Sequence, residues 1–172
     1  MKKPLIALLV AAITAAGIAV YAWMNLQQPM NEVLASDSRN AGIEVRVSYD
    51  GWLPGSAIVY DLTAVAGSNS PADVFRVFLQ YAAKKKDERF ERIYLSHRGV
   101  RKFYVEGFYF RTLGEEFGSQ NAVYTIRTFP EHVMTPSGLP AFSKWEGGIL
   151  GVSMRQMDDF SNFTKQWFLS DL

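Results

Sequence analysis

The chain begins with a long apolar run. No charged side chain occurs from Pro4 to Met24, and two lysines come directly before the run. A helix over these residues would measure about 31 Å, close to the hydrocarbon thickness of a bilayer. Tyr21 and Trp23 lie near its end, where aromatic side chains favour the membrane interface. We therefore expect residues 1–24 to form an N-terminal transmembrane anchor.

A cleavable signal peptide has the same positively charged start, so a second interpretation of this segment stays open. Val20 and Ala22 would suit a cleavage site, although the apolar run exceeds the usual length of about 7 to 15 residues. Because positive charges stay in the cytoplasm, the N-terminus belongs there and the chain beyond Asn25 lies outside. Both interpretations predict an extracytoplasmic domain, which in a bacterium faces the periplasm or the cell exterior.

After the apolar run the chain becomes polar, and further on apolar and polar residues alternate. Residues 25–42 carry little apolar periodicity and predict a solvated stalk or linker. From Ile43 to Tyr49 apolar and polar side chains alternate, which is typical of a strand with one buried face. A second strand is predicted over Ala57–Val65, and the turn signals between the two favour an antiparallel pair.

A helix start signal follows the second strand. Ser70 can cap the backbone amide of Asp73, and Pro71 suits the first helical position. The residues after it are apolar at spacings of three and four, which predicts an amphipathic helix that ends near three consecutive lysines.

The second half of the chain contains shorter patterns of apolar residues. It predicts strands near residues 93–95, 100–105, 122–129 and 149–152, and helices over residues 107–117 and from Ser153 onward. Together these elements predict an α+β fold for residues 43–172. We expect a mainly antiparallel sheet with two or three helices packed on it.

Composition narrows the classes of protein. Hydrophobic residues make up 48% and charged residues 20%, which is enough to build a core. The 18 Lys and Arg nearly balance the 17 Asp and Glu. The chain therefore lacks the excess of basic residues that would predict a nucleic-acid partner. The absence of cysteine excludes disulfides, thiolate metal sites and cysteine catalysis.

Two histidines are the main candidates for chemistry. His132 follows Glu131 on a predicted loop, where a carboxylate could orient an imidazole that acts as a base. His97 follows Ser96, but neighbouring residues on a strand point to opposite faces, which argues against a nucleophile–base pair. Neither histidine has the spacing of a zinc site, so the sequence predicts no metal and no cofactor.

Aromatic residues are unusually dense between Phe103 and Phe110, where five of eight side chains carry rings. A strand followed by a short helix cannot point all five rings inward together. We expect Tyr104 and Tyr109 to reach the surface or line a groove, where tyrosines favour contacts with partners.

These observations favour a non-catalytic function. We expect a membrane-anchored, extracytoplasmic binding or accessory module of the bacterial envelope, with an envelope protein or a cell-wall ligand as partner and the N-terminal helix in the inner membrane. One alternative is an envelope-acting hydrolase that uses His132 and Glu131. Another is a structural subunit of a membrane assembly, whose small residues Ala12, Ala16 and Gly17 would allow close contact between helices.

Overall fold

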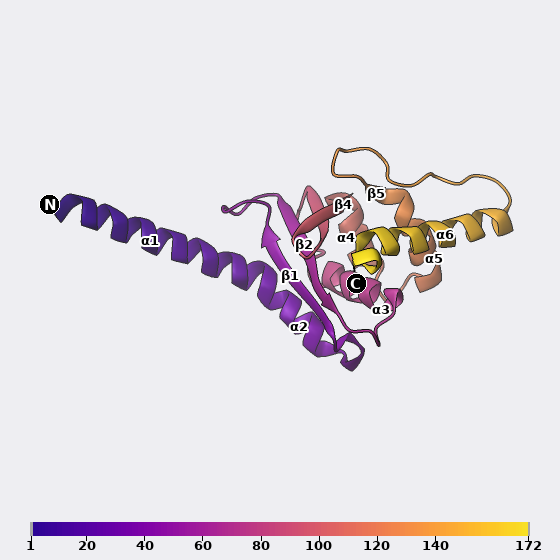
Figure 1. Ribbon diagram of the computed structural model, residues 1–172, viewed down its shortest axis with the longest axis horizontal. Coiled ribbons are helices and arrows are strands. Elements are labelled where there is room, and N and C mark those ends of the chain that lie inside the picture. The colour runs from indigo at the N-terminus through magenta and orange to yellow at the C-terminus, as the bar shows by residue number, and fades with distance from the viewer. Residues whose placement is uncertain (1, 172) are drawn as a thin grey trace.

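The computed structural model describes residues 2–171 and shows a long N-terminal helix joined to a two-layer domain (Figure 1). Helix α1 (Lys2–Ala22), a π-helical turn (Trp23–Gln27) and α2 (Gln28–Ser36) follow one another without a break. Helix α1 projects away from the domain (Figure 1). By length and composition, its stretch from Leu8 with α2 is long and apolar enough to cross a membrane, with a mean hydropathy of 1.7.

The domain contains a five-stranded sheet whose strand order in space is the order along the chain. The strands are β1 (Ile43–Tyr49), β2 (Ala57–Val65), β3 (Arg92–His97), β4 (Val100–Glu106) and β5 (Val133–Met134). The helices of the domain are α3 (Pro71–Lys84), α4 (Gly107–Glu116), α5 (Ala122–Thr128) and α6 (Ile149–Trp167). Short 3-10 turns cover Ser38–Asn40, Phe129–His132 and Leu169–Asp171. The fold is therefore α+β, as the sequence predicts.

The sheet is mixed, which corrects the prediction of a mainly antiparallel sheet. Strands β2 and β3 run parallel, whereas the β1–β2, β3–β4 and β4–β5 pairs are antiparallel. The cause is α3, which carries the chain from one end of β2 back to the other before β3 begins. A parallel pair needs such a crossover, and a helix is its usual form. The strand pattern alone does not reveal which neighbour a strand will choose.

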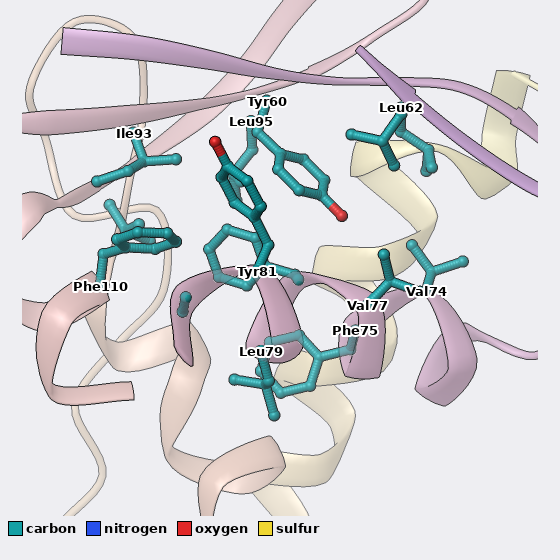
Figure 2. Packing of buried hydrophobic residues seen from close by; sticks show 14 of the residues in the cluster. Tyr60, Leu62, Val74, Phe75, Val77, Leu79, Tyr81, Ile93, Leu95 and Phe110 are labelled. Carbon is teal, nitrogen blue, oxygen red and sulfur yellow. The ribbon is translucent and has the colours of Figure 1, made fainter. Parts of the chain in front are cut away.

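Aromatic side chains fill the space between the sheet and the helices. Tyr60 of β2 lies at the centre, with Phe78 in edge contact at 5.2 Å between ring centroids and Trp167 at 6.1 Å. Figure 2 shows Tyr60 and Leu62 of β2 facing Val77 and Tyr81 of α3 across this core. The first strand confirms the predicted alternation, because its odd-numbered residues are buried and its even-numbered residues are exposed.

Helix α3 begins as the sequence predicts. The Ser70 hydroxyl accepts a hydrogen bond from the backbone N–H of Asp73, and the Asp73 side chain accepts one from the Ser70 N–H in return. This reciprocal capping satisfies two backbone donors at the helix start. The predicted helix over residues 107–117 is also present, as α4.

Two predicted strands are helices instead. Residues 122–128 form α5, where the Asn121 side chain caps the start by accepting from the N–H groups of Val123 and Tyr124. Residues 149–152 form the first turn of α6, which therefore begins before the predicted start at Ser153. Short apolar runs fit a strand and one face of a helix equally well, so periodicity did not distinguish them.

The segment expected to be a solvated stalk is mostly helical and packs on the domain. Leu26, Met30 and Val33 of residues 25–42 are buried in the core. Gln27 replaces a neighbouring strand at the edge of the sheet: its side-chain carbonyl accepts from the Val47 N–H at 2.7 Å, and its amide donates to the Val45 carbonyl at 3.1 Å. Gln27 thus satisfies backbone groups of β1 rather than water.

Candidate functional site: the His132 cleft

A cleft of about 980 Å³ opens beside the β4–β5 edge of the sheet, and we call it the His132 cleft. Its walls come from the ends of β4 and β5, from α4, from the loop of residues 135–148 and from α6. The lining residues are Glu106, Tyr109, Glu131, His132, Met134, Pro140, Ala141, Phe142, Ser143, Lys144 and Asp159.

The imidazole of His132 stacks on the ring of Tyr109. The two ring centroids are 3.8 Å apart and the planes are inclined by 17°. Tyr109 belongs to α4, whereas His132 ends the 3-10 turn before β5, so the stack joins two elements at one wall of the cleft. Tyr109 also lies 6.1 Å from the buried Phe129 ring, which connects the stack to the core. The outer face of the imidazole is exposed.

The surroundings favour a neutral imidazole. Partial removal of water lowers the pKa of His132, the cation of Lys144 lowers it further, and Glu131 opposes both. Since an ordinary histidine has a pKa of about 6.5, His132 is mostly uncharged at neutral pH. Burial raises the pKa of the neighbouring Tyr109 phenol, which therefore stays protonated. Both rings of the stack are thus neutral and available for contacts with an apolar or planar group.

Two carboxylates of the cleft are held by neutral donors. Glu131 accepts a hydrogen bond at 2.6 Å from the side-chain amide of Gln156 on α6. Asp159, also on α6, accepts one at 2.6 Å from the indole N–H of Trp145. Because these donors carry no charge, they orient the carboxylates without neutralising them. The cleft therefore presents fixed negative charges beside its one lysine, Lys144.

Short hydrogen bonds hold the loop that forms the outer wall. The Thr135 N–H donates to the Leu139 carbonyl at 2.8 Å, and the Ala141 N–H donates to the Val133 carbonyl at 2.9 Å. Further along, Trp145 is fixed by Asp159 and covered by the guanidinium of Arg155, 4.7 Å from the ring centroid. The wall of the cleft is thus attached at both ends, to β5 and to α6.

The structure brings together three of the four candidate site residues. Glu131, His132 and Tyr109 all line the cleft. Tyr104 does not: it is 5% exposed and lies against Tyr94, with Arg92 over its ring at 5.3 Å. Its burial differs from the expectation that it reaches the surface. On the sheet face without helices, Tyr104 is covered by neighbouring strands and by the loop near Gly138.

The other sequence candidates, Ser96 and His97, lie outside the cleft. They are buried in the sheet, where the Ser96 carbonyl accepts from the Trp167 indole at 3.0 Å. Asp159 lies in the cleft, and nothing in the sequence links it to His132. Trp145 and Lys144 were missed as well, although a tryptophan in a turn-rich segment could have indicated an ordered loop. Among residues 2–171 no cluster of three His, Asp or Glu side chains could hold a metal ion.

No protein-family model matches the chain, and no curated protein or solved structure shows significant similarity to it.

Proposed function

We propose that this chain is a membrane-anchored binding module of the bacterial envelope, with the His132 cleft as its ligand site. The N-terminal helix crosses the inner membrane once, its N-terminus lies in the cytoplasm, and the α+β domain faces the periplasm or the exterior. Support for the anchor comes from the exposed apolar run of α1 and from the two lysines before that run.

Protease treatment of spheroplasts tests this topology. Protease added outside should digest the domain after Asn25 and leave a fragment of the size of the anchor. Complete protection of the domain would contradict the orientation. A mature N-terminus found near Trp23 would show instead that the apolar run is a cleaved signal peptide.

The observation that carries the binding function is the Tyr109–His132 stack beside two fixed carboxylates. A neutral, planar platform with charged groups held at its edge suits recognition of a ligand with an apolar or planar part and a polar or cationic part. Binding sites of this kind need groups whose positions are set before the ligand arrives. Here Gln156 and Trp145 provide that order.

Ring removal tests the binding function. Tyr109→Ala should weaken capture of the envelope partner by about 1 to 3 kcal/mol, the usual contribution of an interface anchor. His132→Ala should also weaken capture, since the exposed imidazole forms the outer face of the stack. Melting curves of both variants establish that the fold is retained. Capture that is unchanged in Tyr109→Ala would contradict this function.

A hydrolase is the second candidate, because a neutral imidazole lines a cleft that also contains the hydroxyl of Ser143 and three carboxyl groups. A general base must be neutral to accept a proton, and it contributes about 10² to 10⁴ in rate. However, Glu131 bonds to Gln156, so it does not orient His132 as the sequence analysis expected. Should His132→Ala abolish the cellular phenotype while fold and partner capture stay intact, the hydrolase would replace the binding module.

A further inference from the structure

The hairpin between β1 and β2 carries an exposed apolar tip. Trp52 is 78% exposed and Leu53 is 49% exposed, and no charged residue occurs from Gly51 to Ser56. The one charge at the base, Asp50, forms an ion pair with Arg101 of β4. A tryptophan and a leucine side by side in water are unusual for a turn, which normally contains small and polar residues.

The hairpin lies beside the membrane end of the helix. Strand β1 runs antiparallel to the N-terminal helix, because Gln27 bonds to Val45 and Val47 whereas Asn25 donates to the Tyr49 hydroxyl at 2.6 Å. Burial raises the pKa of Tyr49, and Tyr21 of α1 is among the neighbours that contribute. The end of β1 therefore lies level with the last turn of α1, and the hairpin continues past it toward the N-terminus (Figure 1).

The rise per residue of an extended chain and of a helix limits the depth of the hairpin tip. Trp52 follows Tyr49 by three residues, which in an extended chain amounts to at most about 10 Å. Along an α-helix the same distance corresponds to about six or seven residues. Trp52 therefore reaches no further toward the N-terminus than the last two turns of α1, which belong to the apolar run. That depth agrees with the 5 to 10 Å or so at which interfacial side chains insert between headgroups and acyl chains.

The joint between helix and domain holds this geometry in place. In a π-helical turn some backbone carbonyls lose their helical partner. Here the ammonium of Lys85 donates to the Asn25 carbonyl at 2.6 Å, and the Tyr81 hydroxyl donates to the Leu26 carbonyl at 3.3 Å. Tyr81 belongs to α3 and Lys85 directly follows its last residue, so the core of the domain fixes the direction in which α1 leaves.

We propose that Trp52 and Leu53 insert into the interfacial layer of the bilayer that α1 crosses, which gives the domain a second contact with the lipid. This inference rests on the proposed membrane span. The lipid interface is the occupant that the position favours, because tryptophan prefers that layer and the tip lies at its depth. Two points of contact would fix the tilt of the domain and thereby the direction in which the His132 cleft opens.

Spin labels on the full chain test the insertion. The natural chain has no cysteine, so each label has a single position. Leu53→Cys reports on the hairpin, Val20→Cys reports on the span, and Leu139→Cys, exposed on the 135–148 loop, is the aqueous control. Each variant is reconstituted in vesicles of phosphatidylcholine and phosphatidylglycerol. Collision of the label with oxygen, which enters lipid, is compared with collision with a water-soluble nickel complex.

The outcomes separate the two proposals. We expect the oxygen-to-nickel ratio at Leu53→Cys to approach that of Val20→Cys and to exceed that of Leu139→Cys. A lipid value at Val20→Cys with a water value at Leu53→Cys would overturn the hairpin insertion and leave the span intact. Protection of Leu53→Cys from both reagents would also overturn it, since protein then covers the tip. A water value at Val20→Cys would overturn the span and the insertion together.

Discussion

The pKa of His132 depends on its surroundings in the fold rather than on its place in the sequence. Partial burial, where Tyr109 covers one face of the imidazole, lowers the pKa most, Lys144 lowers it further, and Glu131 raises it. Of these, only Glu131 is adjacent in the chain. The structure places Glu131 and His132 in one cleft, where the Glu131 carboxylate accepts from Gln156 rather than from the imidazole that the sequence-based hypothesis assigned to it.

These causes predict how the pKa of His132 responds to substitution of its neighbours. In the wild type the imidazole signal of His132, followed by NMR, should titrate below about 6.5. Lys144→Gln should move the pKa of His132 upward, because a repelling cation is gone, whereas Glu131→Gln should move it further down. Because the folded pKa is lower than the unfolded one, the stability from this site is complete above about pH 6.5. It is lost as pH falls through the folded value. A midpoint unaffected by Lys144→Gln would contradict the electrostatic cause.

Tyr104 gives a contrasting prediction at the same scale. Because its ring is buried, Tyr104→Ala should leave a cavity and lower the free energy of unfolding by about 3 kcal/mol. Denaturant unfolding measures this loss. Tyr124→Ala is the control, since Tyr124 is 48% exposed and its removal should cost much less. A Tyr104→Ala variant as stable as wild type that loses a partner would instead restore the sequence-based expectation of a surface contact.

At the scale of elements, local signals succeeded where they were complete. Helix α3 has a capping residue, a proline at its first position and an apolar stripe, and its start was predicted correctly. Strand β1 alternates without exception. By contrast, α5 is a short helix in which only Thr125 is buried, and the buried Phe129 comes directly after its end. Its cap, Asn121, is a residue that also occurs in turns, and its apolar run was taken for a strand.

Packing between helices is an element-scale feature that the sequence did not reveal. A Cβ atom on Gly114 of α4 would lie 2.3 Å from the Ala82 carbonyl oxygen of α3. The backbones of the two helices therefore touch, and a glycine is needed where they do so. The sequence shows a glycine within a predicted helix, but not which element lies against it.

Alanine substitution tests this contact. Gly114→Ala should destabilise the domain by about 1 to 3 kcal/mol, because two backbones must move apart. Gly151→Ala is the matched control in α6, where an added Cβ meets nothing within 4 Å. That variant should be neutral or more stable by up to about 1 kcal/mol, since alanine favours a helix. Equal effects of both substitutions in thermal melts would contradict the close approach of α3 and α4.

For the molecule as a whole, the main difference from the sequence-based expectation is the connection between helix and domain. Polar residues such as Gln27 and Asn25 indicated a solvated stalk, yet their side chains bond to β1. Sequence patterns distinguish polar from apolar residues, but they do not show whether a polar group will find water or an unpaired strand edge. The helix is thus a rigid extension of the domain.

Substitution of Lys85 tests whether the domain holds the helix in this direction. Lys85 is buried, and its ammonium bonds both to the Asn25 carbonyl and to Glu88. Lys85→Met should reduce the free energy of unfolding by about 1.5 to 3 kcal/mol, the range for hydrogen bonds to a charged group. Lys84→Met, which removes an exposed ion pair with Glu32, should cost at most about 1 kcal/mol. If both losses are alike, the buried contact does not hold the joint.

Whether the His132 cleft binds a ligand of the envelope is answered most sharply by in-cell photo-crosslinking. A photoreactive amino acid replaces Ser143 at the cleft in one variant and Thr63, on the distant β2 strand, in another. We predict a discrete adduct at Ser143 that is absent at Thr63 and is lost when Tyr109→Ala is added. An identical adduct from both positions, or one from Ser143 that persists without the Tyr109 ring, would contradict the assignment of the cleft.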